Sequence, residues 1–230
     1  MGQKWLVQIN PTKTVVMLFS KKRHPPKLPH LILDGNQLQV VTSHKHLGIV
    51  LTQSLDWSEY INSLLSKCNR LISIFKRYKY RWSRMALETC YKSFVRPIIE
   101  YGNIIYDSCT QGQSKQIESL QLEAARLVTG TKKGSSPSNL VSELGWESLQ
   151  SRRSNAKNVK MYEIANRIAP SYLIDIIEKF RPDDSHFTRS HARLNYTMPR
   201  CRTSQYYKSF FLSGISGWNK LNESIKQSIS

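Results

Sequence analysis

The chain has 230 residues, 40% of them hydrophobic, so it can bury a core and fold as one large or two small domains. Its 34 Lys and Arg residues outnumber its 16 Asp and Glu residues, which gives a formal net charge of +18. Such an excess is rarely needed by an enzyme that acts on small molecules, and it is typical of proteins that bind a polyanion. The composition therefore makes nucleic acid the first partner to consider.

Neither a membrane span nor a secretory signal is indicated by the sequence. No run of about 18 apolar residues occurs, and the N-terminal stretch reaches the polar Asn10 too early to form a signal-peptide core. We therefore expect an intracellular protein, nuclear or cytoplasmic, that is not secreted and has no membrane partner; its oligomeric state is left open. The four cysteines do not have the Cys-x-x-Cys spacing of zinc sites and are expected to be free thiols: Cys68, Cys90, Cys109 and Cys201.

Residues 1–53 have the pattern of short strands. An apolar run at 15–19 precedes a polar, proline-rich loop. Apolar residues then alternate with polar ones on both sides of Asp34-Gly35-Asn36, which favours a tight hairpin turn, and a last alternating stretch covers 47–51. These patterns predict three or four strands, forming a small antiparallel sheet.

From Asp56 onward the apolar residues follow a helical period. Asp56 and Glu59 have the spacing of a capping box, and the helix is expected to reach about Tyr78. At about 100° per residue its apolar residues share one face, and the other side carries basic residues with Ile74 among them. We call this second set the basic stripe: Lys67, Arg70, Arg77 and Arg81.

Further helices are expected after Ser83, at about 114–128, 139–144, 147–168 and 172–180. Pro97 should kink or stop the helix that Ser83 caps, and Gly130 should end the next one. The fold expected is α+β and mostly α, in three parts: 1–53 with the strands, 54–132 with the first helices, and 133–230 as a helical C-terminal extension.

Several stretches in fixed order carry a family resemblance: Trp5–Thr14, Lys45–Ile49 followed by Trp57, Tyr91–Gly102, Tyr206–Phe211 and Trp218–Leu221. Together they resemble the C-terminal part of the reverse transcriptases of jockey-like non-LTR (LINE-type) retrotransposons. The resemblance implies that the three parts are a palm remnant, a thumb-like domain that clamps a duplex, and the tail of the same reading frame. It also implies RNA and DNA as partners, with a primer–template duplex as the ligand.

The resemblance assigns roles to individual residues. Lys13 takes the place of the motif D lysine, which is thought to protonate the departing pyrophosphate and is thus a candidate general acid. The segment that matches the primer grip contributes four candidate nucleic-acid contacts: Lys45, His46, Leu47 and Gly48. The basic stripe would contact the phosphates of the duplex in the thumb.

The metal site of the family has no counterpart in this sequence. Polymerases of this kind bind two magnesium ions through carboxylates of an apolar Phe/Tyr-x-Asp-Asp hairpin, which in the family precedes motif D. The adjacent aspartates of this chain, Asp183 and Asp184, stand among proline and polar residues, as in a solvated turn. We therefore expect the chain to bind no cofactor and not to polymerise alone. His186 and His191 have the wrong spacing for a metal site.

Simpler interpretations remain open for each signal. Lys13 could be an ordinary lysine at a strand entry, Gly48 a strand glycine at a bulge or close backbone approach, and the stripe a solvated helix face. Tyr80 and Trp82 are the aromatic residues left as candidates for base stacking, because Phe75 and Tyr78 fall on the apolar face. For the chain as a whole, the alternatives are a domesticated, non-enzymatic RNA- or DNA-binding protein and a degenerate retroelement relic without function.

Overall fold

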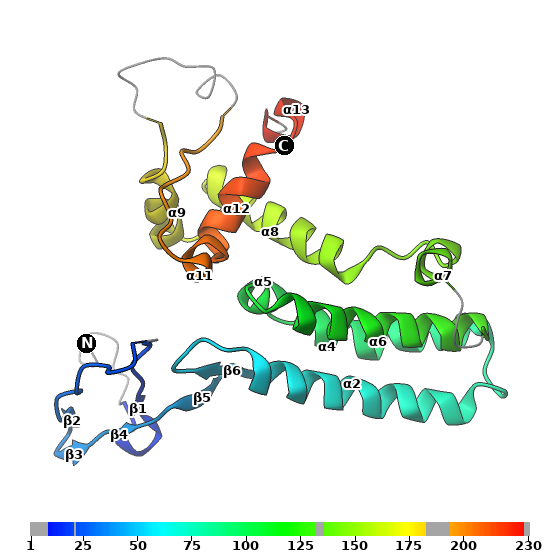
Figure 1. Ribbon diagram of the computed structural model, residues 1–230, viewed down its shortest axis with the longest axis horizontal. Coiled ribbons are helices and arrows are strands. Elements are labelled where there is room, and N and C mark those ends of the chain that lie inside the picture. Colours follow the sequence, from blue (N-terminus) through cyan, green and yellow to red (C-terminus); the bar gives the residue numbers. More distant parts are fainter. Residues whose placement is uncertain (1–8, 21, 132–135, 183–193, 228–230) are drawn as a thin grey trace. The chain divides into compact units, whose positions relative to one another are not determined.

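The structure is a computed structural model that describes residues 9–20, 22–131, 136–182 and 194–227. The chain divides into two compact units, Met1–Leu64 and Leu65–Ser230 (Figure 1). Short paired strands in the first unit and a series of helices in the second confirm the expected α+β, mostly α class. The three-part division and the palm and thumb assignments stay predictions.

The described part of the first unit contains three pairs of short strands. They are β1 (Val15–Val16) with β4 (Gln39–Val40) in parallel, β2 (Ile32–Leu33) with β3 (Asn36–Gln37) antiparallel, and β5 (Ser43–His46) with β6 (Ile49–Thr52) antiparallel.

The predicted hairpin turn at Asp34-Gly35 is confirmed. The predicted antiparallel pairing is wrong for the first strand. Asp34 and Gly35 have φ values of 47° and 76°, the left-handed pair that a two-residue hairpin loop requires. Of the apolar run 15–19, only Val15 and Val16 form a strand, and this strand is parallel to β4. The connection between them contains a complete hairpin, so the chain returns to β1 in its original direction.

The first long helix, α2 (Ser58–Tyr78), begins close to where the sequence predicts. Asp56 caps it, because its Oδ1 accepts a hydrogen bond from the Ser58 N–H at 3.2 Å. Glu59 does something the capping-box pattern does not anticipate: its carboxylate accepts a hydrogen bond from the Ser43 hydroxyl at 2.9 Å and so ties α2 to β5. The predicted apolar face is buried at its centre: Ile61, Leu64, Cys68, Ile72 and Phe75.

The helix that Ser83 caps does not stop at Pro97. The Ser83 hydroxyl accepts the Ala86 N–H at 3.2 Å and starts α3 (Arg84–Cys90), as predicted. The chain then widens into a π-helical turn, η2 (Tyr91–Val95), and continues as α4 (Arg96–Glu100). The wider turn precedes the proline, whose ring would otherwise clash with the preceding turn and which has no N–H to donate.

The next helices are α5 (Asn103–Tyr106), α6 (Gln111–Thr129) and α7 (Pro137–Glu143). A capping box formed by Thr110 and Gln113 starts α6 a few residues earlier than the sequence analysis expects. Gly130, with φ at 73°, ends α6 as predicted.

The C-terminal helices are α8 (Leu149–Ala165), α9 (Ser171–Glu178), α11 (Ser204–Tyr207), α12 (Phe210–Asn219) and α13 (Glu223–Gln227). Helix α12 packs against α8 (Figure 1). Met161, Leu212 and Trp218 are among the buried residues of this contact. A Cβ at Gly214 would lie 2.8 Å from the Met161 side chain, so this close packing requires a glycine there.

Arg152 and Arg153, near the start of α8, both contact residues of the preceding helices. Arg152 forms an ion pair with Glu100. Arg153 is only 3% exposed and donates to the Asp107 carboxylate at 3.1 Å and to the Ser114 hydroxyl at 2.7 Å. Both arginines therefore join α8 to the preceding helices, and Arg153 is too deeply buried to contact a ligand.

The four cysteines are free, as predicted. Asp183, Asp184, His186 and His191 lie outside the described residues. Within the described ranges no three His, Cys, Asp or Glu side chains come together as a metal site would need, and no helix has the length and apolarity to cross a bilayer.

Candidate nucleic-acid interface

The basic stripe lies on the exposed side of α2 and of the turn that follows it. Lys67, Arg70 and Arg77 belong to the helix, and all four residues of the stripe are exposed. Arg81 lies just past the helix end, where its N–H donates to the Tyr78 carbonyl at 2.9 Å. At about 100° per residue the three helical members fall within about 80° of each other and opposite the buried face. Their predicted placement is thus confirmed.

The stripe is electrostatically unpaired within the described part of the chain. None of its four residues forms an ion pair with a described carboxylate. Neighbouring basic residues behave differently: Lys76 pairs with Glu123, and Arg84 pairs with Glu143 at 2.8 Å. An exposed cation without an acidic partner can accept a phosphate without first losing an ion pair.

The two aromatic candidates for base stacking have different surroundings. Tyr80 is 89% exposed, with the Lys79 Nζ 4.6 Å from its ring centroid. Trp82 stacks on Tyr78 with centroids 5.1 Å apart and an interplanar angle of 12°, so one of its faces is already occupied. Tyr80 is therefore the more accessible of these two candidates for stacking on a base.

The segment that resembles a primer grip forms the tip of the β5–β6 hairpin. Lys45 pairs with Val50 and His46 with Ile49, leaving Leu47 and Gly48 as the two-residue turn. Their φ values of 46° and 87° are those of a hairpin turn, so Gly48 marks a turn and not a strand bulge. Lys45, His46, Leu47 and Gly48 are all exposed.

Lys13 is exposed at the end of a short 3-10 turn, η1 (Pro11–Lys13), directly before β1. Asn10 caps this turn, because its Oδ1 accepts the Thr12 N–H at 3.0 Å. Lys13 and the hairpin tip belong to the first unit and the basic stripe to the second. Each unit thus presents its own exposed basic residues.

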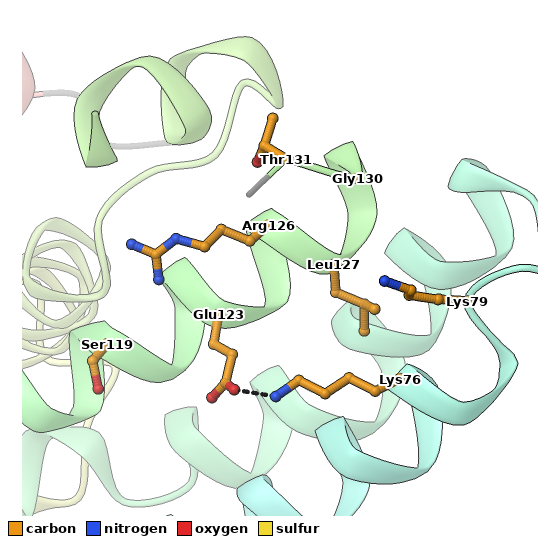
Figure 2. Close-up of a pocket in the computed structure, with 8 residues that line it drawn as sticks. All are labelled: Lys76, Lys79, Ser119, Glu123, Arg126, Leu127, Gly130 and Thr131. Carbon is orange, nitrogen blue, oxygen red and sulfur yellow. Dashed lines mark hydrogen bonds and ion pairs between the residues drawn. The ribbon is translucent and has the colours of Figure 1, made fainter. Parts of the chain in front are cut away.

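A second basic surface lies in the second unit, and the sequence analysis does not identify it. Lys76 and Lys79 on and after α2, together with Arg126 on α6, line a groove of about 480 Å³ (Figure 2). A helical-wheel comparison of α6 with α2 is the one signal that could suggest it, since Arg126 lies on the side of α6 opposite its buried residues. The sequence does not indicate that α2 and α6 lie side by side, so it gives no reason to compare these two helices.

Exposed cations without an acidic partner among the described residues, such as those of the basic stripe, are typical of surfaces that bind polyanions. Over 134 residues the chain is 26% identical to the "Probable RNA-directed DNA polymerase from transposon X-element" of Drosophila melanogaster. It is also 27% identical over 130 residues to the "Probable RNA-directed DNA polymerase from transposon BS" and 23% identical over 132 residues to the "RNA-directed DNA polymerase from mobile element jockey", both from the same species.

Each of these matches covers 55–56% of this chain and 14% of the relative's length. No protein-family model matches the chain, and no solved structure is significantly similar to it. Over about half of its residues the chain is therefore similar to a part of these RNA-directed DNA polymerases of Drosophila transposable elements.

Proposed function

We propose that the chain binds nucleic acid, with a primer–template duplex as its ligand, through the basic stripe and the tip of the β5–β6 hairpin. The observation that carries the proposal is the basic stripe: four exposed cations on one side of α2 and its following turn, with no acidic partner among the described residues. The names of the related proteins, RNA-directed DNA polymerases, support the same class of ligand.

Binding of this kind depends on phosphates and not on base sequence. Lys and Arg side chains displace the counterions condensed on a duplex, so affinity falls as salt rises. Such contacts set the position of the protein on the backbone and leave sequence unread. At the hairpin tip, the exposed Lys45 and His46 would contact the backbone near the primer end, next to the turn at Leu47 and Gly48.

The test is the salt dependence of duplex binding. Neutralising the basic stripe with Lys67→Gln, Arg70→Gln, Arg77→Gln and Arg81→Gln should lower the log–log salt slope by about 3 to 4, since each phosphate contact contributes about 0.9. The buried face of α2 is untouched, so far-UV circular dichroism should not change. A matched variant neutralises four exposed cations elsewhere: Lys22, Arg23, Lys27 and Lys208. If both variants weaken binding alike, the stripe is only part of a diffuse basic surface.

We further propose that polymerisation needs the carboxylates of a Phe/Tyr-x-Asp-Asp hairpin, a motif that this 230-residue sequence does not contain. Lys13 could act as the general acid toward pyrophosphate only beside bound magnesium, and the described residues include no cluster able to hold a metal. The purified chain should therefore extend no primer with magnesium or manganese. Template-dependent incorporation above a no-protein control would overturn this.

A further inference from the structure

The C-terminal part of the second unit contains a long stretch without acidic residues. Residues 185–222 include six Lys and Arg side chains and no Asp or Glu. Within the described part of this stretch, Arg200 and Arg202 lie in the segment before the short helix α11, and Lys208 directly follows it (Figure 1). None of these three exposed cations forms an ion pair with a described carboxylate. The segment around α11 therefore carries a local excess of positive charge.

Two tyrosine side chains lie on the surface next to these arginines. Tyr206 is 48% exposed and Tyr207 is 51% exposed, and both belong to the single turn of α11. Their neighbours Cys201 and Phe210 pack against the buried cluster formed by α8, α9 and α12. The segment is thus anchored to the core on both sides of α11. The two tyrosine rings are not needed for that packing and are held in a defined position at the surface.

The end of a helix explains one of the three cations but not the other two. Lys208 is the C-cap of α11, a position where positive charge is favoured, so we leave it out. Arg200 and Arg202 instead precede Thr203, the N-cap of α11, where the helix dipole disfavours a cation. Helix ends therefore give no reason for these two arginines. We define the α11 surface by four exposed residues: Arg200, Arg202, Tyr206 and Tyr207.

The side chains of the α11 surface match the two parts of an unpaired nucleotide. Guanidinium groups supply planar pairs of N–H donors that fit the oxygens of a phosphate. A tyrosine ring can stack on a base whose face is exposed, as in a single strand, whereas neighbouring base pairs cover both faces inside a duplex. An acidic peptide would match the arginines but has no flat surface for two aromatic rings. The combination therefore favours a single strand over a duplex or an acidic protein segment.

We propose that the α11 surface binds unpaired nucleotides of a nucleic-acid strand. Arg200 and Arg202 contact the phosphates, and Tyr206 and Tyr207 stack on bases. At about 100° per residue the two rings lie on different sides of the helical turn, so they contact different bases. This site goes beyond the proposed function, because it is a different surface from the basic stripe and takes an unpaired strand instead of a duplex.

Binding of oligo-dT and oligo-U to the full chain tests this, with circular dichroism to verify the folding of each variant. Tyr206→Leu with Tyr207→Leu should weaken binding about tenfold, because the stacking on bases is lost. Tyr206→Phe with Tyr207→Phe keeps both rings and should bind like the unaltered chain. Arg200→Gln with Arg202→Gln should lower the log–log salt slope by about 1.4, since each single-strand phosphate contributes about 0.7. The control pair removes the same charge from exposed positions of the same unit and should lower the slope clearly less: Lys179→Gln with Lys220→Gln.

Two altered strands show whether bases contact the tyrosines. A strand that contains 5-bromouracil should cross-link on irradiation to Tyr206 or Tyr207, as located by mass spectrometry of the digested chain. A strand of abasic sites keeps the phosphates and lacks the bases, so it should bind the unaltered chain about tenfold more weakly than oligo-dT. The leucine pair should bind the abasic strand as tightly as the unaltered chain does.

Several results would refute the single-strand site. They are cross-links to other residues alone, full binding by the leucine pair, a phenylalanine pair as weak as the leucine pair, and equal effects of the two charge pairs. Binding of poly-glutamate that the leucine pair weakens would assign the rings to an acidic protein segment instead. The proposed function is tested separately: the stripe variant should keep the tyrosine cross-link, and the leucine pair should keep the duplex salt slope.

Discussion

Two buried hydrogen bonds made by Gln121 connect three segments of the second unit and allow a quantitative prediction. Gln121 is 1% exposed; its Oε1 accepts the Tyr91 hydroxyl at 2.9 Å and its Nε2 donates to the Glu147 carbonyl at 2.8 Å. Burial raises the pKa of the Tyr91 hydroxyl, so this group stays protonated and remains a donor at any working pH. These hydrogen bonds link η2 and α6 to Glu147, which directly precedes Ser148, the N-cap of α8.

The free-energy cost of removing these hydrogen bonds depends on which buried groups lose their partners. Gln121→Leu keeps the side-chain volume but strands two groups, the Tyr91 hydroxyl and the Glu147 carbonyl, at about 1 to 3 kcal/mol each. Tyr91→Phe strands only the Gln121 carbonyl oxygen, again at about 1 to 3 kcal/mol. The double variant leaves only the Glu147 carbonyl unpaired, so its cost should be well below the sum of the two single costs.

Urea unfolding followed by circular dichroism measures all three free energies. At about 2 to 4 °C per kcal/mol for a chain of this size, Gln121→Leu should also lower Tm by about 4 to 24 °C. Tyr172→Phe, on the exposed side of α9, is the matched control and should change the free energy of unfolding by less than about 0.5 kcal/mol. Additive single costs, or a Tyr91→Phe cost no larger than that of the control, would show that the hydrogen bonds contribute nothing beyond packing.

Two further predictions concern the same unit. Gly214→Ala should destabilise the folded protein by about 1 to 3 kcal/mol in thermal melts, because the new Cβ would lie 2.8 Å from the Met161 side chain. Gly112→Ala is the control: its Cβ would have its nearest neighbour at 3.9 Å, so this variant should be neutral or mildly stabilising. Hydrogen bonds from Lys92 and Trp146 lower the pKa of Glu88, so its stabilising effect is present above the unfolded pKa and is lost as pH falls through the folded one. Glu88→Gln should therefore flatten the acid side of the stability–pH profile, and an unchanged acid limb would contradict this.

The sequence by itself determined those features that depend on near neighbours. Ser83 and Gly130 set one helix start and one helix end because a cap acts within a single turn. The Asp34-Gly35 turn and the buried face of α2 follow from a local φ requirement and a helical period. The resemblance to jockey-like reverse transcriptases, borne out by the related Drosophila proteins, likewise needs only the order of short stretches along the chain.

Tertiary structure decided what depends on residues far apart in sequence. Arg152 looks like a surface cation until Glu100, 52 positions away, is placed beside it. Lys76 pairs with Glu123 across 47 positions, and the groove containing Arg126 exists only because α2 and α6 lie together. The parallel pairing of β1 depends on a connection that contains a complete hairpin. The periodicity of apolar residues along the sequence does not indicate such contacts, because each contact results from packing that buries the apolar faces of several helices and strands at once.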